Sequence, residues 1–332
     1  MEKPAWPARL ELARLPTPIE RLRRAEERLG GPELYVKRDD LTGAGLSGNK
    51  VRKLEFHVAA AEAAGADTLV TCGGLQSNHC RATALVAARR GLRCHLVLRG
   101  ERPSAASGNL FLALFAGATV SWIDADRYRR IDEVFDALSA SLQGAGHRPW
   151  IIPEGASDPL GTLGYIRAQQ ELVEGWGDGP PFTHIAHACG SGGTAAGLAL
   201  GAARFGVEAE ILSIAVCDDA TAFRARIGAL MAATSARYPE LAPSAPLPTI
   251  IDRYVGAGYG LTCPAQRSAM LDLSRCEGVV LDPSYSGKAW FGLRREIEAG
   301  RLTSAHRVLF VHTGGVFGLL ADGVSFSAHL GL

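Results

Sequence analysis

The chain has 332 residues, of which 47% are hydrophobic and 21% charged, and its formal net charge at pH 7 is +1. This apolar content with so little net charge excludes a largely disordered chain, and the even charge balance argues against binding of nucleic acid or a membrane surface through charge alone. At about 150 residues per domain, the length predicts roughly two domains.

Short apolar runs with strand character alternate with Ala-rich helical stretches along the chain. The predicted strands cover residues 34–37, 68–72, 94–98, 119–122, 149–152, 184–188, 210–216 and 308–312. The predicted helices cover residues 51–64, 79–90, 109–116, 128–142, 161–174, 194–205, 220–236, 264–276 and 287–298. This alternation predicts an α/β fold of open, twisted parallel sheets with helices on both faces.

Two α/β domains are predicted. The small domain covers residues 51–157, and the large domain is built from residues 1–50 plus 158–332. Active sites in open α/β sheets lie at the carboxyl ends of the strands, so the loops that follow the strands should hold the functional residues.

The first such loop is rich in Gly and Ser and leads into a helix at Lys50. Lys is rare here: only Lys3, Lys37, Lys50, Lys53 and Lys288 carry an amine, and Lys, unlike Arg, can form a Schiff base. The helix dipole and the neighbours Arg52 and Lys53 should lower the pKa of Lys50. A neutral amine could form an imine with a carbonyl cofactor, although a solvated Lys at a helix start is the simpler interpretation.

The second loop carries four consecutive polar side chains between a strand and a helix. Either Ser77 or Asn78 could simply cap the helix. Four polar side chains exceed what one cap requires, so the loop could instead hold an anion, such as a substrate carboxylate, at the helix N-terminus. The four residues are Gln76, Ser77, Asn78 and His79.

The third loop is a Gly-rich turn between the strand at 184–188 and a helix. Its amides and hydroxyls could hold a phosphate, and because it lacks Lys it is not a Walker A loop. With Asp218 after the next strand, the same turn could bind a dinucleotide, as in an NAD-dependent dehydrogenase. The turn alone does not separate these alternatives. It consists of Gly190, Ser191, Gly192, Gly193 and Thr194.

Two late segments also follow predicted strands or precede a helix. Tyr285 could stack on a ring and Thr313 could hydrogen-bond to one, although packing and capping are the more common roles of such residues. His184 and His187 lie three apart on a strand and face opposite sides, so no metal site is expected.

The seven cysteines show no C-x-x-C spacing and lie mostly in apolar segments, which predicts buried, reduced thiols. No run approaches the ~18 apolar residues of a membrane span, and the first residues contain no signal-peptide core. We therefore expect a cytoplasmic protein.

Together the motifs resemble the 1-aminocyclopropane-1-carboxylate (ACC) deaminase/D-cysteine desulfhydrase family of fold-type II enzymes, which depend on pyridoxal 5′-phosphate (PLP). The matching segments are YVKRDDLTGAGLSGNKVRKLEF, GGLQSNH, GSGGTAAG, DPSYSGKAW and FVHTGG, in the family's order. The resemblance implies a tryptophan synthase β-like fold with PLP between two α/β domains, a small amino-acid substrate and a homodimer. It implies no metal, nucleic acid or membrane partner.

The resemblance also implies a role for each matching residue. Lys50 holds PLP as a Schiff base and is the first candidate for the base that removes the Cα proton, with Ser77 or a Tyr on the other face. The implied cofactor-binding residues are Lys50, Asn78, Gly190, Ser191, Gly192, Gly193, Thr194, Tyr285 and Thr313. The implied catalytic residues are Lys50, Ser77, Tyr259 and Tyr285, and the implied substrate contacts are Gln76, Ser77, Asn78 and His79.

One departure separates the subfamilies. Deaminases carry Glu after the Tyr that matches Tyr285, where it holds the pyridine nitrogen protonated, and an apolar residue where Thr313 stands; here the first position is Ser286. A hydroxyl on the ring nitrogen makes the ring a weaker electron sink, which suffices when a good leaving group departs from Cβ. We therefore expect β-elimination of D-cysteine to pyruvate, ammonia and hydrogen sulfide.

The sequence leaves other activities open. ACC deamination, or elimination from another β-substituted amino acid such as cysteate or chloroalanine, would use the same residues. An NAD-dependent dehydrogenase using the turn at 190–197 and Asp218 would leave Lys50 without a role. A non-catalytic relative of the same fold would not need Lys50, Ser77 and both tyrosines.

Overall fold

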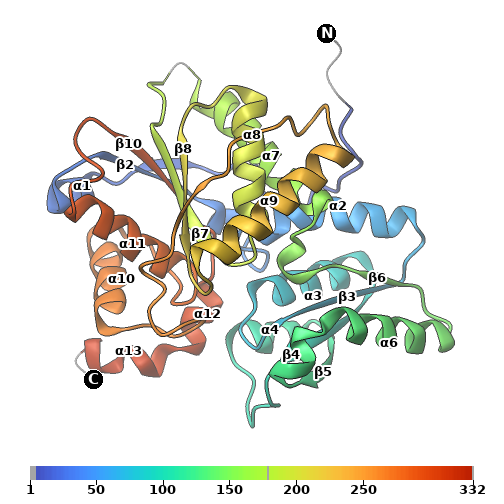
Figure 1. Ribbon diagram of the computed structural model, residues 1–332. Coiled ribbons are helices and arrows are strands. Elements are labelled where there is room, and N and C mark those ends of the chain that lie inside the picture. Colours follow the sequence, from blue (N-terminus) through green and yellow to red (C-terminus); the bar gives the residue numbers. More distant parts are fainter. Residues whose placement is uncertain (1–4, 178, 331–332) are drawn as a thin grey trace.

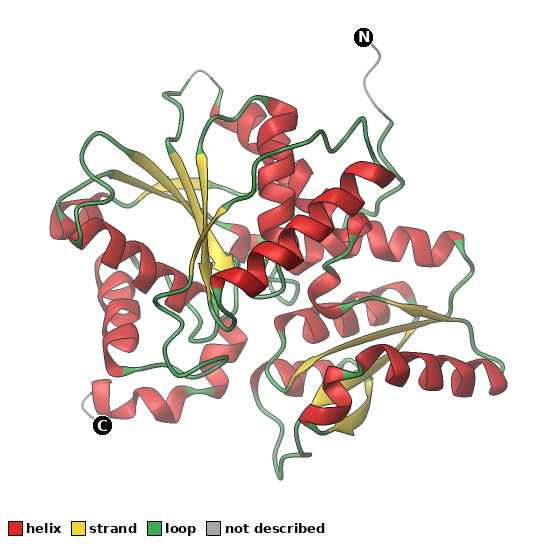
Figure 2. Cartoon of the chain, viewed as in Figure 1, coloured by secondary structure: helices red, strands yellow, loops and turns green. Residues whose placement is uncertain are grey.

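A computed structural model describes residues 5–177 and 179–330 (Figures 1 and 2). The strands are β1 (Ile19–Arg21), β2 (Glu33–Lys37), β3 (Thr68–Gly74), β4 (Arg93–Arg99), β5 (Thr119–Ile123), β6 (Pro149–Ile151), β7 (His184–Cys189), β8 (Glu210–Ala215), β9 (Thr249–Ile251) and β10 (Arg307–Val311). The α-helices are α1 (Arg23–Leu29), α2 (Lys50–Ala63), α3 (Asn78–Arg90), α4 (Gly108–Phe115), α5 (Ala125–Arg129), α6 (Ile131–Gly144), α7 (Pro159–Trp176), α8 (Gly193–Phe205), α9 (Ala220–Arg237), α10 (Pro264–Glu277), α11 (Ser286–Glu298), α12 (Val316–Ala321) and α13 (Gly323–Leu330). Two short 3-10 helices, η1 (Asp39–Leu41) and η2 (Glu154–Ala156), complete the elements.

The strands form two separate sheets, which confirms the expected α/β fold. The larger sheet has the order β1-β2-β10-β7-β8-β9, and the smaller has the order β5-β4-β3-β6. Every pairing is parallel except that of the edge strand β1, which runs antiparallel to β2. The antiparallel edge follows from a short connection: the segment between β1 and β2 holds only the helix α1 and does not return the chain to the other end of the sheet.

Helices cover both faces of the larger sheet because alternate strand residues point to opposite sides. On β10, Leu309 and Val311 pack with residues of α7 and α8. The intervening Val308 and Phe310 pack with residues of α10 and α11. Central strands buried on both faces are apolar throughout, which is why these runs were recognisable as strands.

Helices also cover both faces of the smaller sheet, where alternate strand residues again point to opposite sides. Leu69 and Leu96 pack with residues of α2, α3 and α4 on one face. Val70 and Val97 face the other side and pack with α6, whose Phe135 is the buried residue of that helix. The two sheets lie side by side, joined mainly where α2 packs on α7 (Figure 1).

Several short elements have no counterpart among the predicted ones. These are β1, β9, α1, α12 and α13, each of three to eight residues, too short for a periodic pattern to be recognised. The helix expected over 128–142 is instead two helices, because Arg130 adopts a non-helical backbone between α5 and α6.

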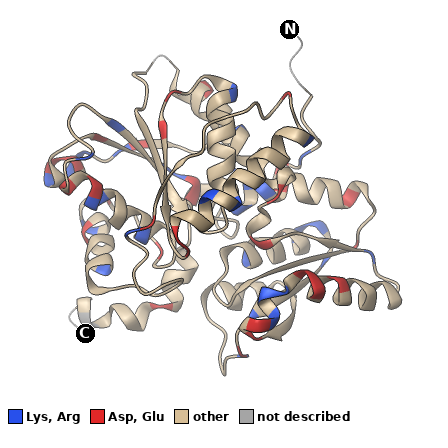
Figure 3. Cartoon of the chain, in the orientation of Figure 1, with Lys and Arg blue, Asp and Glu red and all other residues tan. Residues whose placement is uncertain are grey.

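The structure also shows the state of the cysteines and the distribution of the charged residues. Each of the seven cysteines is free; five are buried, while Cys217 and Cys263 are partly exposed. In Figure 3, the positions of basic and acidic residues are interspersed along the chain in both parts of the molecule, in keeping with the near-zero net charge. No helix in the described ranges combines the length and apolar content that crossing a membrane requires.

Candidate active site

A cavity of about 800 Å³ lies between the two sheets, at the carboxyl ends of β3, β4 and β7. It is lined by most of the residues predicted from the sequence: Lys50, Ser77, Asn78, His79, Gly190, Ser191, Gly192, Thr194, Tyr259, Tyr285 and Thr313. Gln76 and Gly193 are not among the residues that line it. The loops that follow strands of both sheets therefore meet at one place, as parallel-sheet topology requires.

Lys50 is the first residue of α2, and its amine faces the cavity. Burial lowers the pKa of Lys50 to about 8, while the more distant carboxylate of Glu154 acts in the opposite direction. The direction agrees with the sequence-based expectation, but its main cause is loss of solvent rather than the charges of Arg52 and Lys53. No hydrogen bond from the Lys50 amine is formed within the described part of the chain, so the amine is free to react.

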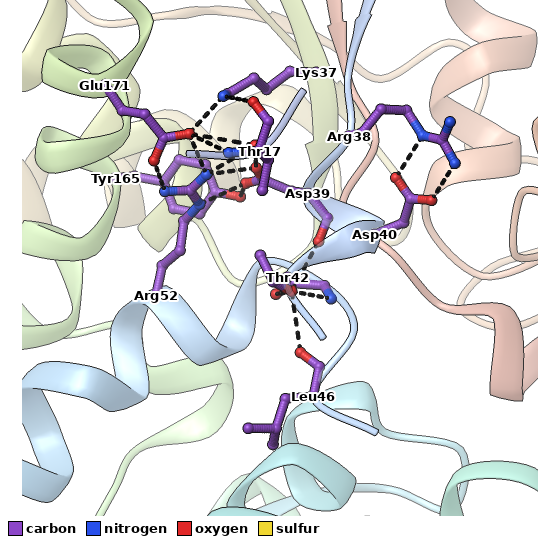
Figure 4. Close-up of polar contacts among 11 residues, drawn as sticks. Thr17, Lys37, Arg38, Asp39, Asp40, Thr42, Leu46, Arg52, Tyr165 and Glu171 are labelled. Carbon is purple, nitrogen blue, oxygen red and sulfur yellow. Dashed lines mark hydrogen bonds and ion pairs between the residues drawn. The ribbon is translucent and has the colours of Figure 1, made fainter. Parts of the chain in front are cut away.

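Arg52 has little influence on Lys50 because its charge is neutralised elsewhere. Its guanidinium donates to Asp39 at 2.7 Å and to Glu171 at 2.7 Å, in a buried network that also contains Lys37 and Tyr165 (Figure 4). Arg52 is 2% exposed. The network connects the first turn of α2 to the end of β2 and to α7. It therefore fixes the position of the start of α2, where Lys50 lies.

The polar loop after β3 caps the following helix and also leaves a polar atom without a partner. Ser77 caps α3 by accepting a hydrogen bond from the Cys80 amide at 3.2 Å. Asn78 is buried, yet its side-chain oxygen Oδ1 has no hydrogen-bond partner within the described residues. A buried amide oxygen without a partner costs about 1–3 kcal/mol, so this atom points to a ligand that would satisfy it.

Gln76 is directed away from the cavity. Its side-chain nitrogen donates to the Ser107 carbonyl at 3.0 Å, and its oxygen accepts from the Asn109 amide at 2.9 Å. The residue thus connects the polar loop to the start of α4. The adjacent His79 lines the cavity, bonds through Nε2 to Thr71 at 2.9 Å, and is held neutral because burial lowers its pKa well below the ordinary value.

The glycine-rich turn after β7 forms the opposite wall. Gly192 has a φ of +92°, a conformation that favours glycine, and it caps the start of α8. Ser191 Oγ lies 2.7 Å from Ser157 Oγ, and Thr194 Oγ1 accepts from the side-chain amide of Asn49 at 3.1 Å. Backbone amides, hydroxyls and a helix N-terminus together form a site suited to a phosphate group.

Lys53 adds a positive group close to this turn. A Cβ placed on Gly193 would lie 2.7 Å from the Lys53 amine, which also donates to the Gly155 carbonyl at 3.2 Å. Burial, followed by the charge of Lys50, lowers the pKa of Lys53 well below its ordinary value. An incoming phosphate dianion would supply the counter-charge that Lys53 lacks in the protein alone.

Two tyrosines close the side of the cavity between the turn and the polar loop. The hydroxyls of Tyr259 and Tyr285 lie 2.7 Å apart, and their rings meet edge to face with centroids 5.6 Å apart. Burial raises the pKa of Tyr259 to about 12 and raises the pKa of Tyr285 well above its ordinary value, so both hydroxyls are protonated at neutral pH. A Cβ on Gly190 would lie 3.0 Å from the Tyr285 ring, closer than an ordinary contact, so a larger residue would require this ring to shift by a few tenths of an ångström.

Thr313 and Ser286, the residues that separate the subfamilies, lie in different places. Thr313 follows β10 and lines the cavity, and its carbonyl accepts from the Asn49 amide at 3.1 Å, next to Lys50. Ser286 is fully buried and its hydroxyl donates to Asp282 at 2.6 Å. Of these two hydroxyls, only that of Thr313 is available to a group in the cavity.

Several lining residues escaped the sequence analysis. Arg99 ends β4, and Glu154 and Ser157 follow β6, while Tyr128 donates to Glu154 at 2.8 Å. The signal was available, because all but Tyr128 follow predicted strands at the carboxyl edge of the smaller sheet. They went unnoticed because no recognisable motif surrounds them.

The arrangement fits PLP. It offers a buried amine for the aldehyde, a phosphate-binding turn with Lys53 nearby, the unpartnered Asn78 oxygen for a polar ring substituent, and the Thr313 hydroxyl. A dinucleotide fits less well: Asp218 is bound to Arg226 at 2.9 Å beside the turn instead of being free for a ribose, and Lys50 would have no role.

Comparisons with known proteins agree with this arrangement. Residues 10–314 match the family described as "Pyridoxal-phosphate dependent enzyme". The chain is 38% identical to a bifunctional D-cysteine desulfhydrase/ACC deaminase of Arabidopsis thaliana, over 95% of this chain and 82% of that protein. It is also 38% identical to a D-cysteine desulfhydrase of Klebsiella pneumoniae, over 94% of this chain and 95% of that protein.

Comparison with solved structures gives similar proteins as well. The crystal structure of an ACC deaminase homologue superposes with a TM-score of 0.89 at 33% identity, covering 97% of this chain and 96% of that chain. O-ureido-L-serine synthase, at 20% identity, shares the fold with a TM-score of 0.66 over 97% of this chain and 98% of that one.

Proposed function

The chain belongs to the pyridoxal-phosphate dependent enzymes, within the ACC deaminase/D-cysteine desulfhydrase family, and we propose that it catalyses β-elimination of D-cysteine, or of a similar β-substituted amino acid. The enzyme is a PLP-dependent lyase. The proposed reaction breaks the Cα–H and Cβ–S bonds and, after hydrolysis, yields pyruvate, ammonia and hydrogen sulfide.

PLP, when bound, withdraws electrons from the substrate Cα and so makes its proton removable. Lys50 would hold the cofactor through its amine. With a pKa near 8, the same amine can accept the Cα proton and release it again at neutral pH. The tyrosine pair, protonated at neutral pH, would orient the substrate and could donate a proton on the side opposite Lys50.

The polar loop would hold the substrate carboxylate. Ser77 and Asn78 lie at the N-terminus of α3, where backbone amides and the helix dipole favour an anion. Holding the carboxylate here would orient the amino acid between Lys50 and Tyr259.

The choice of β-elimination depends on Thr313. Its hydroxyl lines the cavity. Ser286, at the position of the deaminase Glu, does not line the cavity, and its hydroxyl donates a hydrogen bond to Asp282. A neutral hydroxyl on the pyridine nitrogen would leave that nitrogen unprotonated. Loss of a thiolate from Cβ tolerates the weaker electron sink, whereas opening of a cyclopropane ring is more demanding.

A substrate panel tests the proposal. The PLP-loaded protein would be mixed with D-cysteine, L-cysteine and ACC, and sulfide, pyruvate and the four-carbon keto acid from ring opening would be measured. We expect sulfide and pyruvate from D-cysteine, and a Thr313→Val variant about tenfold slower. Keto acid from ACC without sulfide from either cysteine would favour the second candidate, ACC deamination, which the Arabidopsis relative's name also includes.

We also propose a homodimer and domain boundaries at 50/51 and 157/158. Large apolar side chains are exposed on α4 and α13, among them Phe115 at 79% and Val324 at 89%, and a partner copy could cover them. Molecular mass in solution from light scattering tests the dimer. Limited proteolysis near residue 157 tests the boundary.

A further inference from the structure

Arg99 is a cation at the edge of the cavity that the proposed reaction with cysteine does not use. It is the last residue of β4, and its backbone pairs with Gly74 of β3, three residues before Ser77. Its guanidinium carbon lies 5.0 Å from the ring centroid of Tyr128 and 5.9 Å from that of Tyr259. Two aromatic rings therefore position the guanidinium, and neither neutralises it.

Apart from Lys50, the other charged groups of the cavity have partners. Arg226 is bound to Asp218, Glu154 accepts from the Tyr128 hydroxyl, and Asp158 is 2.9 Å from His57. Arg99 has no carboxylate within 4.0 Å and no hydrogen-bond partner for its guanidinium among the described residues. A solvent-accessible guanidinium held by aromatic contacts keeps its N–H donors available for an anion.

The order of groups around the cavity shows where such an anion would lie. The Gly190 turn is next to Tyr285, whose hydroxyl contacts Tyr259, and Tyr259 is under Arg99. Arg99 is thus separated from the phosphate-binding turn by both tyrosines, and it is beside the loop that would hold the substrate carboxylate. A substituent on Cβ that extends past Tyr259 would meet its guanidinium.

We propose that Arg99 is a specificity-determining residue that binds an oxyanion on the β-substituent of the substrate, so that the preferred substrates are amino acids bearing a β-sulfonate, O-sulfate or O-phosphate. This inference rests on the proposed β-elimination and specifies which leaving groups on Cβ the enzyme prefers. Two oxygens of such a group match the paired donors of a guanidinium, whereas a thiol offers no such pair. The cavity, at about 800 Å³, is large enough for a substituent bigger than a thiol beside the cofactor.

The reaction balances without an oxidant or reductant. For cysteate, the Cα–H bond breaks and the proton goes to a base, while the Cβ–S bond breaks and its electron pair leaves with sulfur as sulfite. Water then hydrolyses the remaining enamine, so that cysteate and water give pyruvate, ammonium and bisulfite. With O-phosphoserine the Cβ–O bond breaks instead, and phosphate leaves.

The test compares kcat/KM for both enantiomers of cysteate, O-phosphoserine and serine O-sulfate with kcat/KM for the neutral β-chloroalanine, using the PLP-loaded enzyme. We expect the oxyanion/neutral ratio to fall about 10- to 100-fold in Arg99→Gln, and Arg99→Lys to lie between that variant and wild type. Arg93→Gln is the matched control: it removes an exposed Arg at the other end of β4 and should leave the ratio unchanged.

A binding measurement separates recognition from turnover. 2-Amino-3-phosphonopropionate carries the oxyanion on a carbon–phosphorus bond that elimination does not break, so a spectral titration gives its Kd directly. Its affinity should fall about 10- to 100-fold in Arg99→Gln, while that of alanine should change much less.

The outcomes distinguish this inference from the proposed function. If β-chloroalanine and cysteine are turned over but no oxyanionic substrate is, or if Arg99→Gln changes all substrates equally, the role of Arg99 is overturned and β-elimination stands. If the loaded enzyme eliminates from none of these amino acids, the proposed function itself fails.

Discussion

Lys50 and Arg52 belong to the same turn of α2, yet their surroundings are opposite, and Arg52 is buried while Lys50 is partly buried. Burial would lower the pKa of Arg52, but Asp39 and Glu171 raise it well above its ordinary value, and Arg52 in turn helps to lower the pKa of Glu171 to about 2 (Figure 4). The Lys50 side has no such carboxylate contact, and burial lowers the amine pKa to about 8.

The difference shows that burial alone does not determine the charge of a basic group. A buried basic group stays charged where carboxylates contact it. Where no carboxylate is in contact, burial lowers its pKa and favours the neutral form. One side of α2 thus anchors the helix through a saturated ionic network, while the other side keeps its amine reactive.

The largest effect should come from Lys50→Ala. It removes the amine that would hold the cofactor and move the Cα proton, so we expect loss of the visible imine band and a decrease in turnover of at least about 100- to 10,000-fold. Absorbance and product formation measure the two together. Retention of both would refute the assignment of Lys50, and circular dichroism would show that the variant is folded.

The next largest effect should come from Arg52→Met, which leaves Asp39 and Glu171 buried without their main counter-charge. Loss of one partner of a buried ion pair costs about 3–5 kcal/mol in the free energy of unfolding. Urea denaturation measures it. The control is Arg90→Ala, which breaks an exposed pair with Glu62 and should cost less than about 1 kcal/mol. Equal costs for the two variants would contradict the comparison.

Lys53→Met removes the second amine of the same turn of α2, near the glycine-rich turn, and leaves Lys50 in place. Because Lys53 lacks a carboxylate contact, its replacement should leave the free energy of unfolding of the apo-protein within about 1 kcal/mol of wild type, or raise it. The Kd for PLP should rise about 10- to 100-fold as a charged contact near the glycine turn is lost. Unchanged PLP affinity would remove Lys53 from the cofactor site.

The smallest effect is a pH dependence. Imine formation needs the neutral amine, and with a pKa near 8 about one tenth of Lys50 is neutral at pH 7 and about nine tenths at pH 9. The rate of PLP capture by the apo-protein should therefore rise about tenfold between these values and level off above them. A rate that keeps rising steeply to pH 10 would indicate an ordinary lysine pKa.

Much of this site could be predicted from the sequence because its residues follow strands within short motifs. Lys50, Ser77 and the turn at Gly190 are each adjacent to a recognisable element. Arg99 and Lys53 could not be assigned in the same way, since their roles depend on which rings and loops the tertiary fold brings beside them. Pairing across the chain also explains why the three-residue strands β1 and β9 were missed: such strands exist only because a neighbouring strand accepts their hydrogen bonds.

The cause of the Lys50 pKa shift was likewise beyond local sequence. Arg52 stands two residues away and looks like a repelling neighbour, but Asp39 and Glu171, 13 and 119 residues distant, neutralise it. Only the folded chain shows which charges are free and which are paired.

The place of β10 in the larger sheet affects how the protein is synthesised. β10 inserts between β2 and β7, so that sheet lacks an inner strand until residues 307–311 emerge from the ribosome. All four strands of the smaller sheet emerge earlier, and that part of the nascent chain can fold first. Because Thr313 follows β10 and lines the cavity, the pocket is complete only once this inner strand has been made and inserted.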